Sequence, residues 1–282
     1  MKVIEERLVG GHLSTSVGIE NTPISASKFG FRTYQIFSKN QMQWKAKPIP
    51  PETPDKFKKN REANRIQSVM VHASYLLNTA SSDDELREKV REAFRTEIER
   101  CDAIGAELLT FHPGSFKDAT LKIGIENVAS LLNDVISKNQ SVTVLIENSA
   151  GQGNSVGKTF HDIAEIIDKI EYKDKVGICL DTCHAWASGY DFTNEQGYQN
   201  MIDEIKNTVG IEKIMGFHLN DSKKGLGEHV DRHEQIGLGK IGVKGFSLLL
   251  NDKIFFNVPM IMETPKGEAG YMDDLSVLET IV

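Results

Sequence analysis

The stretch TVLIENSAGQGNSVGKTFHDIAEIIDKIEYKDKVGICLDTCH, residues 143–184, predicts the fold of the whole chain. It opens with an apolar run that ends on Glu147, continues through a helical pattern, and returns to a second apolar run that ends on Asp181. Short apolar runs between turn signals are typical of buried parallel strands, which need a helical crossover between them. The stretch therefore predicts a strand–helix–strand unit with a carboxylate at the end of each strand.

The same pattern repeats on both sides of this unit. Four further runs, VMVHAS, LLTFHPG, GFHLND and VPMIME, end at or next to His72, His112, His218 and Glu263. Two earlier runs, RLVGGHLS and TYQIFSKN, end near His12 and Asn40. We therefore expect eight strands, most of which finish on a side chain that can bind a metal ion.

Helical patterns separate these strands. The longest is SDDELREKVREAFRTEIERCDAIG at 82–105, with an acidic start and a terminal glycine, and another helix is expected to begin near Thr53 after a proline-rich loop. Eight parallel strands with helical crossovers are most simply closed as a (β/α)8 TIM barrel, and an open doubly wound sheet is the alternative. Because such a barrel takes about 250 residues, we expect one α/β domain over residues 1–282.

Composition restricts the setting of the protein. A chain that is 39% hydrophobic and 26% charged can form an ordinary large core. The opening MKVIEERLVGG is too polar for a signal peptide, no long apolar run suits a membrane, and three cysteines lack a CxxC pair. We expect an intracellular protein, cytoplasmic or nuclear in a eukaryote. The net charge of −7 disfavours nucleic acid, but three divalent cations would offset most of it.

The residues at the strand ends favour a metal site. A buried imidazole or carboxylate costs free energy without a partner, and one cation can serve several such groups. Any single residue of this kind could be structural, but six strand endings at one edge of a barrel favour a shared site. DTCH adds His184 three residues after Asp181, and DRH pairs Asp231 with His233. Histidine and carboxylate ligands suit zinc, or manganese or iron, in a multinuclear hydrolytic centre.

Other candidate residues have plainer explanations. Cys183 could bind metal, but we expect a small buried apolar side chain, and Cys179 is expected to fill the barrel interior. His161 and His229 are expected to be solvated, while His12 could line the site without binding metal. GQGNSVGKT at 151–159 resembles a phosphate-binding loop, but five residues rather than four separate the relevant glycines, so a nucleotide hydrolase is disfavoured.

The chain resembles the endonuclease IV family, the metal-dependent apurinic/apyrimidinic endonucleases of base excision repair. The resemblance covers almost the whole chain, in order, through GGHLSTSVG, SKNQMQW, VHASYLLN, TFHPGS, LIENSAGQG, CLDTCHAWASGYD, FHLNDSK, DRHEQIGLGKIG and IMETP. It implies a TIM barrel with three zinc ions. The implied ligand sets are His72, His112 and Glu147; Glu147, Asp181, His218 and Glu263; and His184, Asp231 and His233.

The resemblance also implies a reaction. It is hydrolysis of the phosphodiester 5′ to an abasic site in double-stranded DNA, which leaves a 3′-hydroxyl and a 5′-deoxyribose phosphate, together with trimming of blocked 3′ ends. The implied catalytic residues are Glu147, which bridges two zinc ions that activate the attacking water, and Glu263, which helps orient or deprotonate it. Because the site is complete in one chain, we expect a monomer.

The implied DNA contacts lie in two segments. Tyr75 and Leu76 would push into the base stack, with Asn40 and Gln43 as polar contacts nearby. Met42 stands where bacterial members of the family typically have arginine. Methionine can wedge between bases but cannot contact phosphate, so we expect DNA insertion rather than the chemistry to differ.

Two other functions fit parts of this pattern. A sugar isomerase or epimerase on a similar barrel would use one or two metals, and the third set, His184, Asp231 and His233, argues against it. A DNA-damage binder without activity would not need every expected ligand to be present. Strand cleavage would distinguish the endonuclease from both.

Overall fold

Eight parallel strands form one barrel in the computed structural model, which describes residues 1–282. The strands are β1 (Val9–Gly11), β2 (Thr33–Phe37), β3 (Ser68–His72), β4 (Leu108–Phe111), β5 (Thr143–Glu147), β6 (Val176–Asp181), β7 (Ile214–Leu219) and β10 (Met260–Met262). Their order is β1-β10-β7-β6-β5-β4-β3-β2. The ring closes between β1 and β2 through a parallel bridge that pairs His12 with Gln35. The predicted (β/α)8 TIM barrel is thus confirmed.

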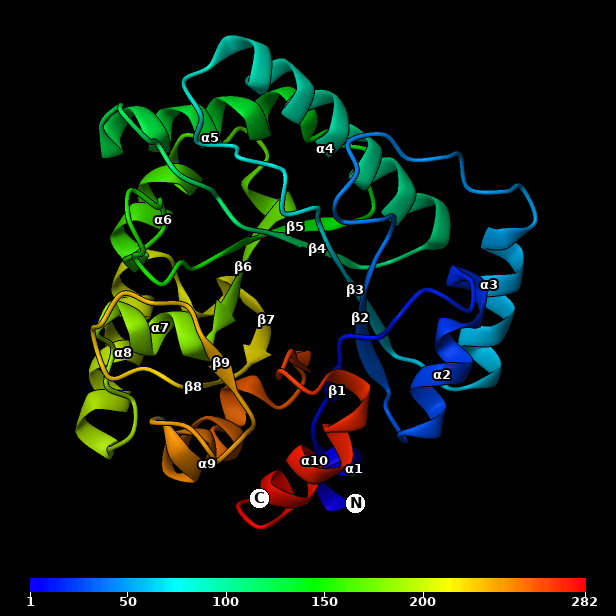
Figure 1. Ribbon diagram of the computed structural model, residues 1–282, viewed down its shortest axis with the longest axis vertical. Helices are drawn as coiled ribbons and strands as arrows, with labels where there is room; N and C mark the ends of the chain where they lie inside the picture. The colour runs from blue at the N-terminus through cyan, green and yellow to red at the C-terminus, as the bar shows by residue number, and fades with distance from the viewer.

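Helices surround the strands, as Figure 1 shows. They are α1 (Lys2–Glu6), α2 (Thr22–Lys28), α3 (Thr53–Ala63), α4 (Asp84–Ile104), α5 (Leu121–Val135), α6 (Phe160–Asp168), α7 (Thr182–Ser188), α8 (Glu195–Thr208), α9 (Gly242–Asn251) and α10 (Tyr271–Glu279). The predicted start at Thr53 is confirmed, and the long helix predicted at 82–105 is α4. Its ends follow from local chemistry: the Asp83 carboxylate accepts from the Leu86 N–H, and Gly105 adopts φ 74°. None of the helices is both long and apolar enough to span a membrane.

The apolar core has two parts. A cluster of 63 buried residues fills the space between the barrel and its helices. A smaller cluster, which includes Met70, Leu145 and Cys179, fills the barrel interior, as predicted for Cys179. This interior is crowded, because a Cβ on Gly216 would lie 2.5 Å from Met70 Cε. The barrel interior is therefore packed with side chains, as is typical of this fold.

The segment that resembled a phosphate-binding loop has a different use. The Ser149 N–H donates to the Gly157 carbonyl at 2.9 Å, which folds the loop back on itself. Thr159 then begins α6 by a capping box with Asp162. The glycines of this loop serve its turns, since Gly151 and Gly157 adopt φ 74° and 82°.

A short hairpin extends from the barrel after β7. Its strands β8 (Asp221–Ser222) and β9 (His233–Glu234) are antiparallel, with Ser222 opposite His233. In Figure 1 the hairpin lies near α7 and α9. It brings a segment with two of the expected ligands to the end of the barrel where the strands finish.

Candidate metal centre

The expected ligands gather at the carboxyl ends of the barrel strands. His72, Glu147 and Asp181 are the last residues of β3, β5 and β6. His218 is the penultimate residue of β7, and His112 and Glu263 directly follow β4 and β10. Parallel strands all finish at the same edge, so the fold itself brings these six side chains together.

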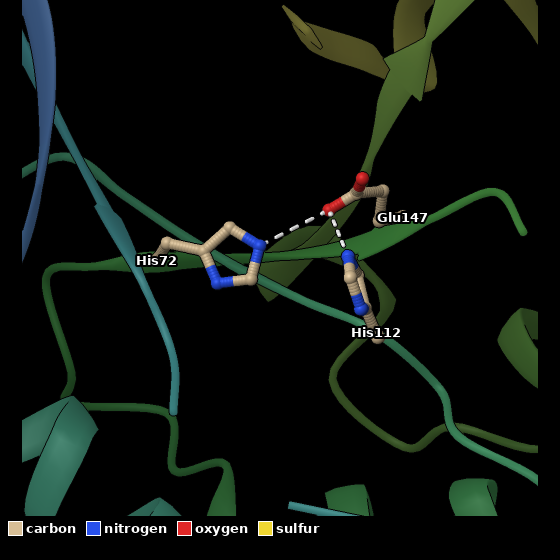
Figure 2. A group of neighbouring side chains, drawn as sticks. All are labelled: His72, His112 and Glu147. Carbon is tan, nitrogen blue, oxygen red and sulfur yellow. Dashed lines mark ion pairs between the residues drawn. The ribbon is translucent and has the colours of Figure 1, made fainter. Parts of the chain in front are cut away.

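The first group surrounds one oxygen of Glu147. His72 Nε2 lies 3.4 Å and His112 Nε2 lies 3.3 Å from Glu147 Oε2. Figure 2 shows both rings pointing at this carboxylate from separate strands. One atom from each member lies within 4.8 Å of the others, close enough to share an ion.

The second group lies on the other oxygen of Glu147. His218 Nδ1 is 3.1 Å from Glu147 Oε1, 3.3 Å from Glu263 Oε2 and 3.9 Å from Asp181 Oδ2. Glu147 therefore touches two groups, one through each oxygen. This is the arrangement that a carboxylate bridging two ions requires.

The third group is built from α7 and the hairpin. Asp181 caps α7 by accepting from the His184 N–H at 2.7 Å, which places His184 in the first turn. His184 Nε2 and His233 Nε2 each lie 3.1 Å from an oxygen of Asp231. The structure thus brings together all three sets expected from the sequence.

Hydrogen bonds orient four of the five imidazoles in the same manner. One nitrogen of each ring faces a carbonyl oxygen: Ala73 O for His72 (2.7 Å), Asn148 O for His184 (2.9 Å), Glu263 O for His233 (3.2 Å) and Gln35 Oε1 for His218 (2.8 Å). A carbonyl only accepts, so that nitrogen carries the proton and the other presents its lone pair to the carboxylates.

The nitrogen and oxygen lone pairs of the cluster face one another, and this arrangement indicates a cation-binding site. His233 Nε2 is buried and has no hydrogen-bond partner, although Asp231 Oδ1 lies close by. Lone pairs on nitrogen and carboxylate oxygen repel unless a proton or a metal ion lies between them. Nitrogen and oxygen donors at these distances suit zinc, manganese or iron, so the residues fit the metal that the fold family implies.

Charge interactions shift the pKa values of the cluster. Burial opposes ionisation of Glu147, but the charges of His218 and His112 outweigh it and hold the pKa of this carboxyl well below its usual range. Burial also opposes ionisation of Asp231, but the neighbouring His184 and His233 lower the pKa of this carboxyl. Burial would lower the pKa of His233, yet Asp231 and Asp181 raise it to about 9. Without metal, protons would thus occupy the place of the missing positive charge.

Cys183 lies within reach of the third group. Its sulfur, Asp181 and His233 are mutually within 4.8 Å. Burial raises the pKa of its thiol to about 12 when no metal is bound. Cys183 is fully buried, as expected, and that it binds no metal stays a prediction.

The expected DNA-contact residues lie beside the centre, on the loops that follow β2 and β3. Met42 and Tyr75 are exposed, by 66% and 53%, and Leu76 is half-buried. The Tyr75 ring packs on His72 and His112, at centroid distances of 5.1 and 5.6 Å, so it partly covers the first group.

Hydrogen bonds give these loops a fixed shape. Ser74 Oγ donates to the Gln41 carbonyl at 2.5 Å and joins the two loops. The Asn40 side chain accepts from the Met42 N–H at 2.9 Å, and the exposed Gln43 accepts from Lys39 through its carbonyl. Asn40 therefore shapes the turn that presents Met42.

Two cavities adjoin the centre. One of about 230 Å³ is lined by His112, Glu147, His184 and Asp231, so it opens on the first and third groups. Another of about 650 Å³ runs past His12, Ser14, Lys39 and Lys266. His12 also contacts Glu263, at 3.1 Å between Nδ1 and Oε1, so one residue that lines this cavity touches the second group.

Some residues differ from expectation. His229 is half-buried rather than solvated, because its Nε2 lies 3.3 Å from Lys158 Nζ in a packed loop. His161 is exposed as expected. Gln35, buried against His218 and Glu263, was not identified as a site residue. In the sequence Gln35 stands out as a polar residue within the apolar run TYQIF. A polar side chain is stable inside a barrel only when it has hydrogen-bond partners.

Fold and site together define a TIM barrel that gathers histidine and carboxylate side chains, able to bind metal ions, at the carboxyl ends of its strands. Residues 25–281 match the family described as xylose isomerase-like TIM barrel. The chain is 47% identical over 270 residues to a protein named "Probable endonuclease 4" from Thermoplasma volcanium, covering 96% of this chain and 93% of the relative. A relative of the same name from Chloroflexus aurantiacus is 41% identical, with 97% of each chain covered.

Comparison with solved structures leads to the same family as comparison with these relatives. The crystal structure of endonuclease IV from Thermus thermophilus superimposes with a TM-score of 0.85 at 31% identity, covering 97% of this chain and 98% of that one. A D-tagatose 3-epimerase-like protein has a TM-score of 0.73 at 20% identity, covering 97% and 96%, and shares the fold alone. The chain belongs to the endonuclease IV family.

Proposed function

We propose that this protein is a DNA-repair endonuclease that hydrolyses the phosphodiester 5′ to abasic sites in double-stranded DNA. The products would be a 3′-hydroxyl and a 5′-deoxyribose phosphate, and blocked 3′ ends would be trimmed at the same site. The observation that carries the proposal is the convergence of nine histidine and carboxylate side chains in a family whose members are named endonuclease 4.

The centre would hold three zinc ions, and manganese or iron would suit some positions. The first would take His72, His112 and Glu147; the second Glu147, Asp181, His218 and Glu263; the third His184, Asp231 and His233. Bound divalent ions supply Lewis-acid chemistry, which makes water a nucleophile near neutral pH and offsets negative charge on a phosphate.

The two catalytic glutamates would act differently. Glu147 is almost fully buried and places one oxygen against each of two groups, so its role is to hold them at a fixed separation. Glu263 faces His218 with Oε2 and His12 with Oε1, and it is only partly buried. A carboxylate held from both sides beside an open cavity can orient a water molecule or accept its proton.

Recognition would depend on the loops beside the centre. Flipping a nucleotide out of a duplex costs a few kcal/mol, and least where the base is already missing. Tyr75 and Leu76 would fill the gap in the stack, and Met42 would wedge from the neighbouring loop with Asn40 and Gln43 beside it. The hydrogen bond from Ser74 Oγ to the Gln41 carbonyl joins the two loops, so they would approach the DNA as one preformed unit.

We also propose that residues 1–282 act as one domain, a monomer that works inside the cell. In support, α1 is tied to α10 by the Lys2 N–H, which donates to Glu279 Oε1 at 2.8 Å. All nine proposed ligands come from one chain. DNA, rather than a membrane, would be the partner.

A sugar isomerase or epimerase is the second candidate, because such proteins share the fold. Those enzymes use one or two metals, which leaves no use for the group of His184, Asp231 and His233. A non-catalytic DNA-damage binder is the third candidate. It has no need for a bridging carboxylate with a strongly lowered pKa, as at Glu147.

The test is incubation of zinc-loaded protein with a duplex that contains one abasic analogue, beside an intact duplex. We expect incision 5′ to the lesion alone. Glu147→Gln should reduce the single-turnover rate by at least about a thousandfold, because a neutral amide cannot bridge two cations. His161→Gln, on an exposed helix position, is the matched control and should cleave normally. No incision by the fully loaded protein would refute the proposal; normal turnover by Glu147→Gln would refute the assigned bridge.

A further inference from the structure

Gln35 is an unusual residue for the interior of a barrel. It lies in the middle of β2 and is fully buried. Alternation along the strand places it on the same face as Thr33 and Phe37. A buried amide is destabilising unless its oxygen and nitrogen both find partners. The contacts of Gln35 therefore indicate what it does.

The amide of Gln35 contacts two proposed ligands. Its Nε2 lies 2.5 Å from Glu263 Oε1 and 2.9 Å from His12 Nδ1. Its Oε1 lies 2.8 Å from His218 Nε2. A carboxylate only accepts hydrogen bonds, so the atom beside Glu263 must be the amide nitrogen. The orientation of the amide is thus fixed by chemistry, and Oε1 faces His218.

This orientation determines which nitrogen of His218 can bind a cation. An amide oxygen accepts a hydrogen bond, so His218 Nε2 carries the proton and Nδ1 carries the lone pair. His218 Nδ1 is the atom that faces Glu147 Oε1 at 3.1 Å and Glu263 Oε2 at 3.3 Å. Gln35 therefore positions two proposed ligands of the second group. It accepts a hydrogen bond from the ring of His218 and donates one to Oε1 of Glu263, whose other oxygen faces His218.

His218 differs in this respect from three other histidines of the centre. His72, His184 and His233 are oriented through Nδ1 by backbone carbonyls. His218 is oriented through Nε2 by a side chain, and that side chain comes from a strand that supplies no proposed ligand. One substitution at Gln35 can therefore remove the hydrogen bond that orients His218 without changing any proposed ligand residue.

We propose that Gln35 is a positioning residue of the metal centre, which sets the tautomer of His218 and aims Glu263 so that both bind the same ion. The inference rests on the proposed metal centre, but it concerns metal binding and not DNA cleavage. Removal of such a supporting hydrogen bond typically weakens metal binding by about 10- to 100-fold. The loss should be confined to the ion of the second group, because Gln35 contacts only that group and His12.

The first experiment measures zinc affinity by competition with a chromophoric chelator. Gln35→Met keeps the length of the side chain but makes no hydrogen bond of this kind. Thr33→Val is the matched control: it lies on the same face of β2, it is buried, and its hydroxyl has no partner. We expect one of the zinc ions to bind about 10- to 100-fold more weakly to Gln35→Met, and no change for Thr33→Val. Cobalt-loaded Gln35→Met should show an altered absorption spectrum for one ion.

The second experiment needs no substitution. Long-range proton–nitrogen spectra of the zinc-loaded wild-type protein, labelled with ¹⁵N in histidine, report which ring nitrogen binds metal. We expect one histidine bound through Nδ1, with a slowly exchanging Nε2 proton, and the other ligand histidines bound through Nε2.

Each result has a clear meaning. All histidines bound through Nε2, or wild-type affinity at every ion in Gln35→Met, would overturn the role of Gln35. If Gln35→Met does not fold, the wild-type spectra decide alone. A wild-type protein that binds zinc with the expected nitrogen pattern but does not cleave abasic DNA would refute the proposed function and leave the role of Gln35 intact.

Discussion

Met42 is the residue at which we expect DNA recognition, rather than the chemistry, to differ from that of related enzymes. Its side chain is 66% exposed at the turn that Asn40 stabilises. A flexible thioether can enter a base step but offers no charge to the phosphates on either side. If Met42 enters the DNA, as proposed, it would therefore do so by apolar insertion alone.

Met42→Arg should therefore bind abasic duplex more tightly, by roughly fivefold at low salt, which corresponds to about 1 kcal/mol for one added phosphate contact. The slope of log K against log salt should steepen by about 0.9. The single-turnover cleavage rate should stay within about twofold. Fluorescence anisotropy and quenched-flow cleavage measure these quantities, with Met42→Leu as the neutral control. Unchanged affinity would mean that Met42 does not reach the DNA.

At the scale of elements, the β8–β9 hairpin depends on one buried carboxylate. Asp221 is fully buried and accepts from the N–H groups of Ser222, Gly237, Gly239, Ile241 and Gly242, at 2.7 to 3.4 Å. Four of these residues lie in the segment after His233, and the fifth, Ser222, pairs with His233 across the hairpin. Asp221 therefore fixes the course of the chain on both sides of a proposed ligand.

Asp221→Ala should destabilise this element strongly. Five N–H groups, in two buried and three part-buried hydrogen bonds, would lose their acceptor, and we expect the free energy of unfolding to fall by about 3 kcal/mol. Urea denaturation of the metal-free protein measures this loss, and zinc competition should show weaker binding at one ion. Asp203→Ala, on the exposed face of α8, should change stability by less than about 0.5 kcal/mol. A small effect of Asp221→Ala would show that water readily replaces the carboxylate.

Elements with a clear period could be predicted from the sequence, and short ones could not. The repeat of apolar residues in α4 and the runs that form β5 and β6 are long enough to show 3.6-residue or strand character. The two-residue strands β8 and β9 and the seven-residue helix α7 are too short for any period. They arise from tertiary contacts, above all those of Asp221 and the cap at Asp181.

Within the site, too, some residues can be predicted from a sequence pattern and others depend on tertiary contacts. His72 and Glu147 could be predicted as site residues because each ends an apolar strand, and strand ends meet at the mouth of a barrel. Gln35 stands out in the sequence only as a polar residue in an apolar run, and its role could not be predicted because it depends on contact with His218, which is distant in sequence. The burial of His229 likewise depends on Lys158, a residue of another loop.

At the scale of the molecule, the cluster couples stability to pH. The pKa values of Glu147, Asp231 and Glu263 are lowered on folding. These carboxylates therefore stabilise the folded protein above pH about 4, and this stabilisation is lost on acidification. The pKa of His233 is raised to about 9, so its contribution is present below pH about 6.5 and lost as pH rises through 9.

The metal-free protein should therefore be most stable between about pH 4.5 and 6.5, and its Tm should fall by several degrees between pH 6.5 and 9.5. The zinc-loaded protein should behave differently, because neutral imidazole is the ligand and metal binding strengthens as protons leave. Differential scanning fluorimetry with and without a chelator compares the two forms. Parallel pH profiles would contradict a metal centre at these residues.

The closure of the barrel has a consequence for biosynthesis. β1 pairs with β10, whose residues lie near the other end of the chain, and the bridge between His12 and Gln35 completes the ring. A ribosome delivers β10 and Glu263 only after almost all the other strands have emerged. A nascent chain can thus assemble the first group of ligands early but cannot complete the second. The proposed centre would therefore be complete only after Glu263 has been synthesised.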